Sequence, residues 1–359
     1  MTAKVIAGLS GGVDSSVAAL QLLEQGCEVE ALFMKNWHER DAAGDCTWEA
    51  DVEDALAVCD KLGIPLNTID LSAAYRDKVF GDFLHEYQQG LTPNPDILCN
   101  QEIKFRAFMD HALGLGAGLI ATGHYARISE DDDGLHLLKG LDAGKDQSYF
   151  LCRLNQRQLR GSLFPVGDLQ KSAVRALAKK AGLPTHDKKD STGICFIGEQ
   201  SFRDFLSRYL PVDKGAITTA DGRIIGEHDG VHFYTLGQRH GLGIGGVKGC
   251  PEEPWYVIGK DRQTNTLMVA QGHNHPDLLS RSLQAHNMNW INNPPATDSF
   301  TCMAKTRYRQ ADQPCTVTVE TGNPVRVEFR QPQRAVTPGQ YVVLYDGDEC
   351  LGGGVIGES

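Results

Sequence analysis

The stretch Gly8-Leu9-Ser10-Gly11-Gly12-Val13-Asp14-Ser15-Ser16 has the composition of a phosphate-binding turn. It follows the apolar run Lys4–Ala7, which predicts a buried strand, and it precedes a helical stretch that Gly26 is placed to end. A glycine-rich turn between a strand and a helix directs backbone N–H groups and the positive end of the helix dipole at one anion. Its serines add hydroxyl donors. The sequence therefore predicts a phosphate site here, with a turn that binds no ligand as the alternative.

The turn differs from the common nucleotide-binding loops. The usual ATPase motif has a lysine after its last glycine, where it reaches the β- and γ-phosphates, and Val13-Asp14 stand at that place here. The dinucleotide fingerprint G-x-G-x-x-G is absent from this position. The string instead resembles the pyrophosphate loop of ATP pyrophosphatases, which cleave ATP between the α- and β-phosphates and adenylate a substrate.

Two other stretches combine a thiol with polar neighbours. Pro93–Asn100 has two prolines in three positions, which predicts a stiff extended loop rather than a helix, and it carries Asp96 and Cys99 three residues apart. Asp190–Gly198 carries Cys195 after a glycine turn, and the two lysines before it favour the thiolate. In isolation, each thiol is explained equally well as a buried structural cysteine.

Composition restricts the class of protein. With 359 residues, 41% hydrophobic and 23% charged, the chain is long enough for two or three soluble globular domains. It has no apolar run near the ~20 residues that span a bilayer, and its start lacks a signal-peptide pattern. Ten cysteines without a C-x-x-C pair fit neither a secreted disulfide framework nor a zinc site. We therefore expect a cytoplasmic protein with no membrane association.

Charge is unevenly distributed along the chain. The net charge of −11 argues against nonspecific binding of nucleic acid. Residues 28–60 contain ten acids and two bases, whereas residues 145–190 contain ten bases and four acids. The second stretch is either a phosphate-facing surface or the solvated face of two helices, and charge alone does not separate the two.

The elements that position these residues alternate between strands and helices in the first half of the chain. We expect strands at 4–7, 27–34, 64–71 and 118–123, and helices at 17–25, 48–62, 75–89, 105–115 and 172–181. This order predicts an α/β fold with a doubly wound parallel sheet, whose ligand lies at the carboxyl ends of the strands. The glycine turn, Met34 and Gly123-His124 would then line one rim.

The second half of the chain has the pattern of β structure. Helical periodicity fades near residues 208–211, and glycine-rich turn signals follow. Clean alternation at 316–319, 325–329 and 341–345 predicts a small antiparallel barrel at the end. We expect an N-terminal domain over 1–201, a central β-rich domain over 202–277 and a C-terminal β-barrel over 278–359.

Six strings, in order, resemble the bacterial tRNA-specific 2-thiouridylase family, whose members put sulfur on the wobble uridine of certain tRNAs. They are GLSGGVDSS at 8–16, NPDILCN at 94–100, ATGHYA at 121–126, KDQSYF at 145–150, DSTGICFIG at 190–198 and TRYR at 306–309. Together they extend over nearly the whole chain, and six ordered strings are far more specific than any one of them.

The resemblance implies a two-stage reaction. ATP adenylates the C2 oxygen of the uridine and releases pyrophosphate, and Mg²⁺ would neutralise that pyrophosphate with Asp14 among its holders. Cys195 would carry a persulfide received from a sulfur-relay protein or cysteine desulfurase, and its terminal sulfur would attack C2. Cys99 would resolve it, by releasing hydrosulfide or by forming a Cys99–Cys195 disulfide. Asp96 would act as general acid or base near the flipped base.

The resemblance also assigns binding residues to a chain expected to be a monomer. The ATP site would comprise Gly8, Leu9, Ser10, Gly11, Gly12, Val13, Asp14, Ser15, Met34 and Gly123. The anticodon arm of tRNA would contact Asn94, Pro95, Asp96, His124, Lys145, Asp146, Gln147, Arg307, Tyr308 and Gln340. Without the resemblance, Arg307 and Arg309 would be taken as solvated arginines on a strand.

Three other functions are compatible with a pyrophosphate loop. An amide-forming ligase or synthetase acting on a small carboxylate would leave the cysteine stretches and the barrel without a role. A tRNA thiolase with an iron–sulfur cluster would need clustered cysteines, and the sequence has none. A nucleotide-binding sensor without catalysis would release no pyrophosphate.

Overall fold

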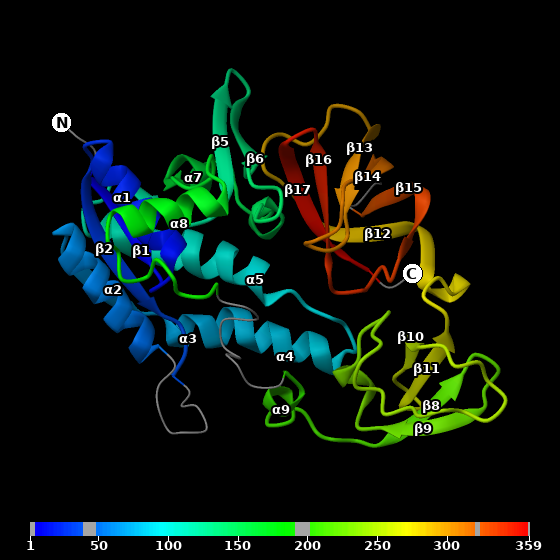
Figure 1. The fold of residues 1–359 in the computed structure, drawn as a ribbon. Coiled ribbons are helices and arrows are strands. Elements are labelled where there is room, and N and C mark those ends of the chain that lie inside the picture. The colour runs from blue at the N-terminus through cyan, green and yellow to red at the C-terminus, as the bar shows by residue number, and fades with distance from the viewer. Residues whose placement is uncertain (1–3, 39–47, 191–201, 320–323, 358–359) are drawn as a thin grey trace.

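A computed structural model describes residues 4–38, 48–190, 202–319 and 324–357 (Figure 1). Its N-terminal part is built on a parallel sheet with the strand order β3-β2-β1-β4-β7. The strands are β1 Lys4–Leu9, β2 Glu28–Lys35, β3 Leu66–Asp70, β4 Leu119–Ala121 and β7 Ser162–Leu163. Chain order reverses between β1 and β4, as the doubly wound fold predicts, and ligands of such sheets bind at this switch point.

Helices cover both faces of this sheet (Figure 1). One face carries α1 Val13–Glu24, α2 Glu49–Leu62 and α8 Lys171–Lys180. The other carries two helical runs, α3 Ser72–Tyr75 with η1 Arg76–Phe80 and α4 Gly81–Gln88, and α5 Pro95–Leu98 with η2 Cys99–Phe108 and α6 Met109–Gly114. Because side chains alternate along a strand, Val5 and Ala7 pack on the first face and Ile6 packs on the second.

Helix α1 begins earlier than the sequence suggested. It starts at Val13 instead of residue 17, because Gly12 is extended (φ −98°, ψ 160°) and occupies the cap position. Asp14 therefore lies in the first helical turn. Gly26 ends the helix in the left-handed conformation (φ +80°), as expected.

The prediction of an extended loop at Pro93–Asn100 is wrong. Pro95 is the first residue of a helical run that continues to Gly114, and the side chain of Asn94 caps it by accepting a bond from the Ile97 N–H at 3.4 Å. Proline is well tolerated at the first helical position, because its missing N–H would have no partner within the helix there. Asp96 and Cys99 therefore lie one turn apart on a rigid helix.

The C-terminal part is a closed antiparallel barrel, in agreement with the sequence. Its strands are β12 Leu279–Trp290, β13 Ser299–Lys305, β14 Gln313–Val319, β15 Val325–Arg334, β16 Tyr341–Asp346 and β17 Glu349–Ile356. Pairing of β12 with β17 closes it. The sequence analysis missed the hairpin β5 Ala126–Asp131 and β6 Gly134–Lys139, whose second strand pairs with β17. The parallel sheet region and the barrel are thus joined by backbone hydrogen bonds.

A smaller sheet lies between these two parts in the chain. It has the order β10-β11-β8-β9, with β8 Gly215–Thr219, β9 Ile224–His228, β10 Trp255–Asp261 and β11 Thr266–Gln271, and helix α9 Phe202–Leu206 precedes it. The Lys260 ammonium donates to the carbonyl oxygens of Gly90 and Tyr234, which ties this sheet to the end of α4. The boundaries after residues 201 and 277 stay predictions. No helix in the described parts of the chain is long and apolar enough to cross a membrane.

Candidate active site

The glycine turn is stabilised by its own hydrogen bonds. The Ser15 hydroxyl donates to the carbonyl of Gly12 at 3.0 Å and accepts from the N–H of Ser10 at 3.2 Å, and the Ser16 hydroxyl donates to the same carbonyl at 2.9 Å. The side chains of Leu9 and Val13 are buried, which leaves their backbones to face a ligand. The turn is therefore preorganised and presents mainly backbone groups.

Two glycines have no space for a side chain. Gly11 has a φ of +72°, and a Cβ added to it would lie 2.5 Å from the Asp51 carbonyl oxygen. A Cβ on Gly123 would lie 2.6 Å from the backbone nitrogen of Ser15. Gly123 follows β4, so the ends of β1 and β4 meet at the first turn of α1, as expected. Met34, half-buried near the end of the neighbouring β2, lies on the same rim.

Asp14 belongs to a cluster of charged side chains that the sequence analysis did not foresee. The Lys171 ammonium lies 2.7 Å from both Asp14 carboxylate oxygens, and the Tyr125 hydroxyl donates to one of them at 2.7 Å. Lys171 also pairs with Asp190 at 2.8 Å. Burial and then the bond to Asp14 raise the pKa of Tyr125, which keeps the phenol a neutral donor.

Asp190 accepts bonds from two further cations. The Lys145 ammonium lies 2.6 Å from its carboxylate and the Arg175 guanidinium 2.8 Å. Burial disfavours the ionised form of Asp190, but the bonds from Lys145 and Lys171 outweigh it and lower its pKa to about 2. Asp190 immediately precedes the stretch with Cys195, which lies outside the described residues.

The basic stretch 145–190 is less positive at the surface than its count suggests. Within the described parts of the chain, five of its ten bases pair with carboxylates, namely Lys145, Arg157, Lys171, Arg175 and Lys188. Lys188 reaches Asp51 and Asp54 on α2, within the acidic stretch 28–60. The two oppositely charged stretches thus neutralise each other in part.

The helix that begins at Asn94 carries the second group of predicted residues. Cys99 is buried, and Asp96 is half-buried. Burial raises the pKa of Asp96, and the nearby positive charge of Lys104 opposes this rise. Lys104, which the sequence analysis did not single out, acts on His124 as well. Burial and then Lys104 lower the pKa of His124, so the imidazole is neutral.

His124 is held rigidly. Its Nδ1 lies 2.8 Å from the Thr122 hydroxyl, and its ring packs against those of Phe105 and Phe164 at 5.7 and 6.1 Å between centroids. The residue is only 8% exposed. Because His124 is enclosed in this way, a contact with RNA would require its surroundings to move.

The structure brings together residues from 145–150 and 306–309. The ring of Tyr308 contacts that of Phe150 with 4.4 Å between centroids, and its hydroxyl donates to the carbonyl of Lys145 at 3.4 Å. Arg307 beside it is exposed. Asp146 and Gln147 serve the fold: Asp146 accepts from the N–H groups of Gly140 and Ser148, and Gln147 accepts from that of Tyr125.

Gln340 connects the barrel to the helix that begins at Asn94. Its amide donates to the carbonyls of Thr92 at 2.8 Å and Pro93 at 3.2 Å. The N–H of Thr92 in turn donates to the carbonyl of Pro338. The segment leading into Asp96 and Cys99 is therefore held in place by the barrel.

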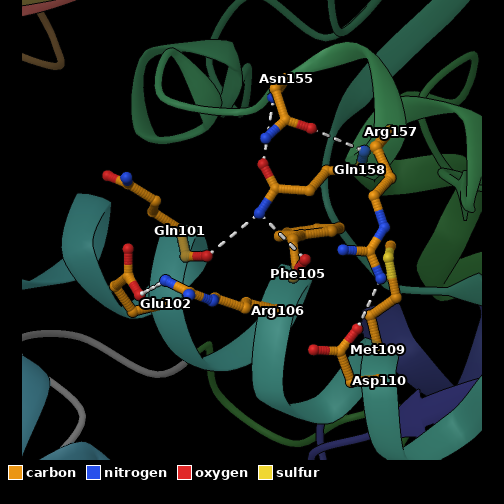
Figure 2. A pocket seen from close by; sticks show the side chains of 9 residues that line it. All are labelled: Gln101, Glu102, Phe105, Arg106, Met109, Asp110, Asn155, Arg157 and Gln158. Atoms are coloured by element: carbon orange, nitrogen blue, oxygen red, sulfur yellow. Dashed lines mark hydrogen bonds and ion pairs between the residues drawn. The ribbon is translucent and has the colours of Figure 1, made fainter.

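A polar pocket of about 230 Å³ lies farther along this helical run, between η2, α6 and α7 Gln156–Arg160 (Figure 2). Its two arginines are already paired, Arg106 with Glu102 at 2.7 Å and Arg157 with Asp110 at 2.9 Å. Neither the glycine turn nor Cys99 lines it. The pocket is thus separate from the residues predicted to do chemistry.

Asp14 does not fit the predicted role of a magnesium ligand. Both of its oxygens accept bonds from Lys171, and one accepts from Tyr125 as well. An ammonium at this distance occupies the position that a cation would need. Among the described residues, no group of three or more His, Cys, Asp or Glu side chains could hold a metal ion.

Three family models match the chain in order. They are described as a tRNA methyl transferase HUP domain at residues 3–199, a tRNA methyl transferase PRC-barrel domain at 203–271 and an aminomethyltransferase beta-barrel domain at 280–356. Among solved structures, NMN synthetase from Francisella tularensis is 22% identical with a TM-score of 0.33, covering 57% of this chain and 72% of that chain.

Similarity to characterised sequences extends along the whole chain. The tRNA-specific 2-thiouridylase MnmA of Nitrosomonas eutropha is 56% identical over 356 residues, 99% of both chains. The proteins of the same name from Haemophilus influenzae and Pseudomonas aeruginosa are 57% and 58% identical, covering 99% and 98% of this chain and 94% of each relative. Identity at this level over the full length shows that the chain belongs to the tRNA-specific 2-thiouridylase family.

Proposed function

We propose that this protein is a tRNA-uridine 2-sulfurtransferase, which replaces the C2 oxygen of the wobble uridine by sulfur and converts ATP to AMP and pyrophosphate. The observation that carries the proposal is 56–58% identity to tRNA-specific 2-thiouridylases over 98–99% of the chain. Two of the family models are described as tRNA methyl transferase domains and the third as an aminomethyltransferase domain. The relatives' name is preferred because it applies to proteins matched from end to end, whereas each model describes one domain.

ATP serves the first half of the reaction. A uracil C2 carbonyl is a poor electrophile with a poor leaving group, so its oxygen must be activated. Attack of this oxygen on the α-phosphate forms an adenylate and expels pyrophosphate. The turn from Gly8 to Ser15 supports this step, since its backbone and serine hydroxyls present donors at the start of α1. Met34 and Gly123 lie on the rim beside it, where the rest of the nucleotide would bind.

Sulfur transfer is the second half. The terminal sulfur of a persulfide on Cys195 attacks C2, and AMP leaves with the former C2 oxygen. The Cys99 thiolate then attacks Cys195 Sγ, so the sulfur–sulfur bond to the base breaks and a Cys99–Cys195 disulfide forms. A cellular thiol must reduce that disulfide before the next cycle. In the other order, Cys99 first releases hydrosulfide from the persulfide, and hydrosulfide attacks C2.

Asp96 acts as the general acid or base in this scheme. It is half-buried one helical turn from Cys99, and its raised pKa suits a group that must both bind and release a proton. Asn94 and Pro95 precede it at the helix start, where the extruded base would enter. The exposed Arg307, with Tyr308 and Lys145, would contact the anticodon arm, while His124, Asp146, Gln147 and Gln340 would support that surface from within.

The partners and setting follow from the reaction. A sulfur-relay protein or cysteine desulfurase would deliver the persulfide, and the enzyme would work as a monomer in the cytoplasm, where its tRNA substrate is. Magnesium would accompany ATP as counter-ion of the phosphates, and Asp14, whose two oxygens accept bonds from Lys171, does not fit as its ligand. The divisions 1–201, 202–277 and 278–359 would serve as catalytic, connecting and tRNA-binding domains.

The deciding experiment is thiolation of an unmodified tRNA transcript with ATP, magnesium and sulfide, read as retarded migration in a mercury-containing gel. Wild type should retard the RNA and release AMP. On a protein-bound persulfide donor, Cys195→Ser and Cys99→Ser should not produce the shift. Full activity of Cys195→Ser with that donor would overturn the persulfide route. Failure of the wild type to thiolate tRNA or release AMP would favour the ligase or the sensor.

A further inference from the structure

The glycine turn lacks the lysine of common ATPase loops, yet the structure places a lysine at its helical end. Lys171, the first residue of α8, has its ammonium 2.7 Å from both carboxylate oxygens of Asp14 in the first turn of α1. Its side chain is only 11% exposed. This nearly buried ammonium is fixed beside the backbone donors of a phosphate turn. A positive charge in such a place attracts a negative ligand more strongly than one that is exposed to water.

We propose that Lys171 binds the pyrophosphate part of ATP, and that Asp14 positions this lysine instead of holding a metal ion. The proposal rests on the proposed function, since ATP cleavage supplies the pyrophosphate. Lys171 would thus provide from a distant part of the chain the cation that the loop sequence lacks. In the reaction, it would stabilise the negative charge that accumulates on the leaving pyrophosphate.

The surrounding charges allow Lys171 to take up a new anion. Lys145, Lys171 and Arg175 pair with the carboxylates of Asp14 and Asp190, and the Asp142 carboxylate accepts from the backbone N–H of Lys171 at 2.9 Å. If Lys171 kept its bonds to Asp14 and exchanged its bond to Asp190 for one to a phosphate oxygen, Asp190 would keep Lys145 and Arg175. Asp14 would keep Lys171 and the hydroxyl of Tyr125. Neither carboxylate would be left without a donor, so the exchange avoids the cost of an unpaired buried charge.

A purely structural role for Lys171 makes different predictions. Helices α1 and α8 already pack through apolar side chains, among them Val17, Val174 and Ala178, and Thr185 donates to Ser16 at 3.0 Å. If Lys171 only joined these helices, its loss would weaken all nucleotide binding in proportion to the loss of folded protein. If Lys171 instead binds pyrophosphate, its loss weakens only the binding of molecules that contain a pyrophosphate group.

The test measures binding of inorganic pyrophosphate and of AMP by calorimetry, with the full chain and without tRNA. Lys171→Gln should raise the Kd of pyrophosphate about tenfold or more, because a charged hydrogen bond is lost, and leave the Kd of AMP unchanged. Lys171→Arg should restore most of the affinity for pyrophosphate. Lys188→Gln is the matched control, since Lys188 also bonds two carboxylates, those of Asp51 and Asp54. This control should bind pyrophosphate as wild type does.

Asp14→Asn separates the positioning role from metal binding. The gain in pyrophosphate affinity caused by added Mg²⁺ should be the same in Asp14→Asn as in wild type. Unchanged pyrophosphate binding by Lys171→Gln, equal losses for pyrophosphate and AMP, or loss of the magnesium effect in Asp14→Asn would each overturn the proposal. These binding measurements need no turnover, so they are distinguishable from a failure of the proposed function, which shows as absent AMP release with tRNA.

Discussion

The nucleotide turn and the predicted RNA-facing residues are built from different parts of the protein. The turn is one contiguous stretch, Gly8–Ser16, that offers backbone groups and is fixed by its own serine bonds and by two glycines without space for a Cβ. The RNA-facing set comes from five separate parts of the chain, namely 94–96, 124, 145–147, 307–308 and 340, and consists of side chains. Several of these side chains, including Asp146 and Gln340, already hydrogen-bond within the protein.

This difference determines what a substitution can reveal. An exposed side chain of the RNA-facing set, such as Arg307, can be removed while the backbone stays in place, so its loss reports its own role. The turn itself presents mainly backbone groups, so testing it requires a change that displaces this backbone.

The largest loss is expected for Asp96→Asn, which removes the proton-transferring group and keeps its shape. Single-turnover thiolation should slow by about 10²–10⁴-fold, the usual contribution of general acid–base catalysis. The Kd for tRNA should change little, as measured by filter binding. If Asp96 only reads the base, the Kd rises and the rate at saturating tRNA stays near that of wild type.

Gly123→Ala tests the turn through its backbone. The new Cβ would lie 2.6 Å from the Ser15 nitrogen and 2.8 Å from the Asp14 carbonyl carbon, so α1 or the segment after β4 must shift. A displacement of about 1 Å in a catalytic site costs roughly 10²-fold in rate. We expect AMP release to fall by that factor while tRNA binding persists. Gly114→Ala, with no atom near its Cβ, should retain wild-type activity.

The same contrast explains what the sequence could predict. The turn and the alternation of strands and helices were predictable because each depends on neighbouring residues, whereas the short edge strand β7 was not expected. Tyr125 and Lys171 are 111 and 157 residues away from Asp14 in the sequence, so no local sequence pattern predicts their contacts with it. The error at Pro93–Asn100 came from reading Pro95 as a helix breaker, although Asn94 before it is a capping residue. The β5–β6 hairpin was missed, and its partner β17 is more than 200 residues away.

Gln340→Ala separates support of the site from contact with RNA. The amide of Gln340 holds the carbonyls of Thr92 and Pro93, so its loss should loosen the start of the helix that carries Asp96. We expect single-turnover thiolation to slow about tenfold, since two hydrogen bonds are removed, with little change in the Kd for tRNA. A higher Kd with an unchanged saturated rate would show that Gln340 contacts RNA directly.

Lys104→Met should move the pH dependence of thiolation. The positive charge of Lys104 opposes the rise that burial causes in the pKa of Asp96, so its removal raises that pKa further. The limb of the pH–rate profile set by Asp96 should therefore move to higher pH, whether Asp96 acts as acid or as base. Lys180→Met, at the exposed end of α8, should leave the profile unchanged. An unmoved limb in Lys104→Met would mean that Asp96 does not set it.

The smallest effect, a change in Tm, is expected at the junction between the β5–β6 hairpin and strand β17 of the barrel. In the β5–β6 hairpin, Nδ1 of His136 lies 2.6 Å from the Glu349 carboxylate in the barrel, and its Nε2 lies 2.8 Å from the Asp131 carboxylate. The hydrogen bond to Glu349, followed by the one to Asp131, raises the pKa of His136 above the usual 6.5. A histidine whose pKa is raised by folding stabilises the folded state. This contribution is fully present below about pH 6.5 and is lost as pH rises through the pKa of the folded state.

His136→Gln should thus lower Tm by roughly 2 °C at most, because the group is partly solvated, and the deficit in Tm should shrink toward alkaline pH. His111→Gln on the exposed side of α6 is the control. A deficit that stays constant with pH would mean that His136 joins the hairpin to the barrel as a neutral hydrogen-bonding group.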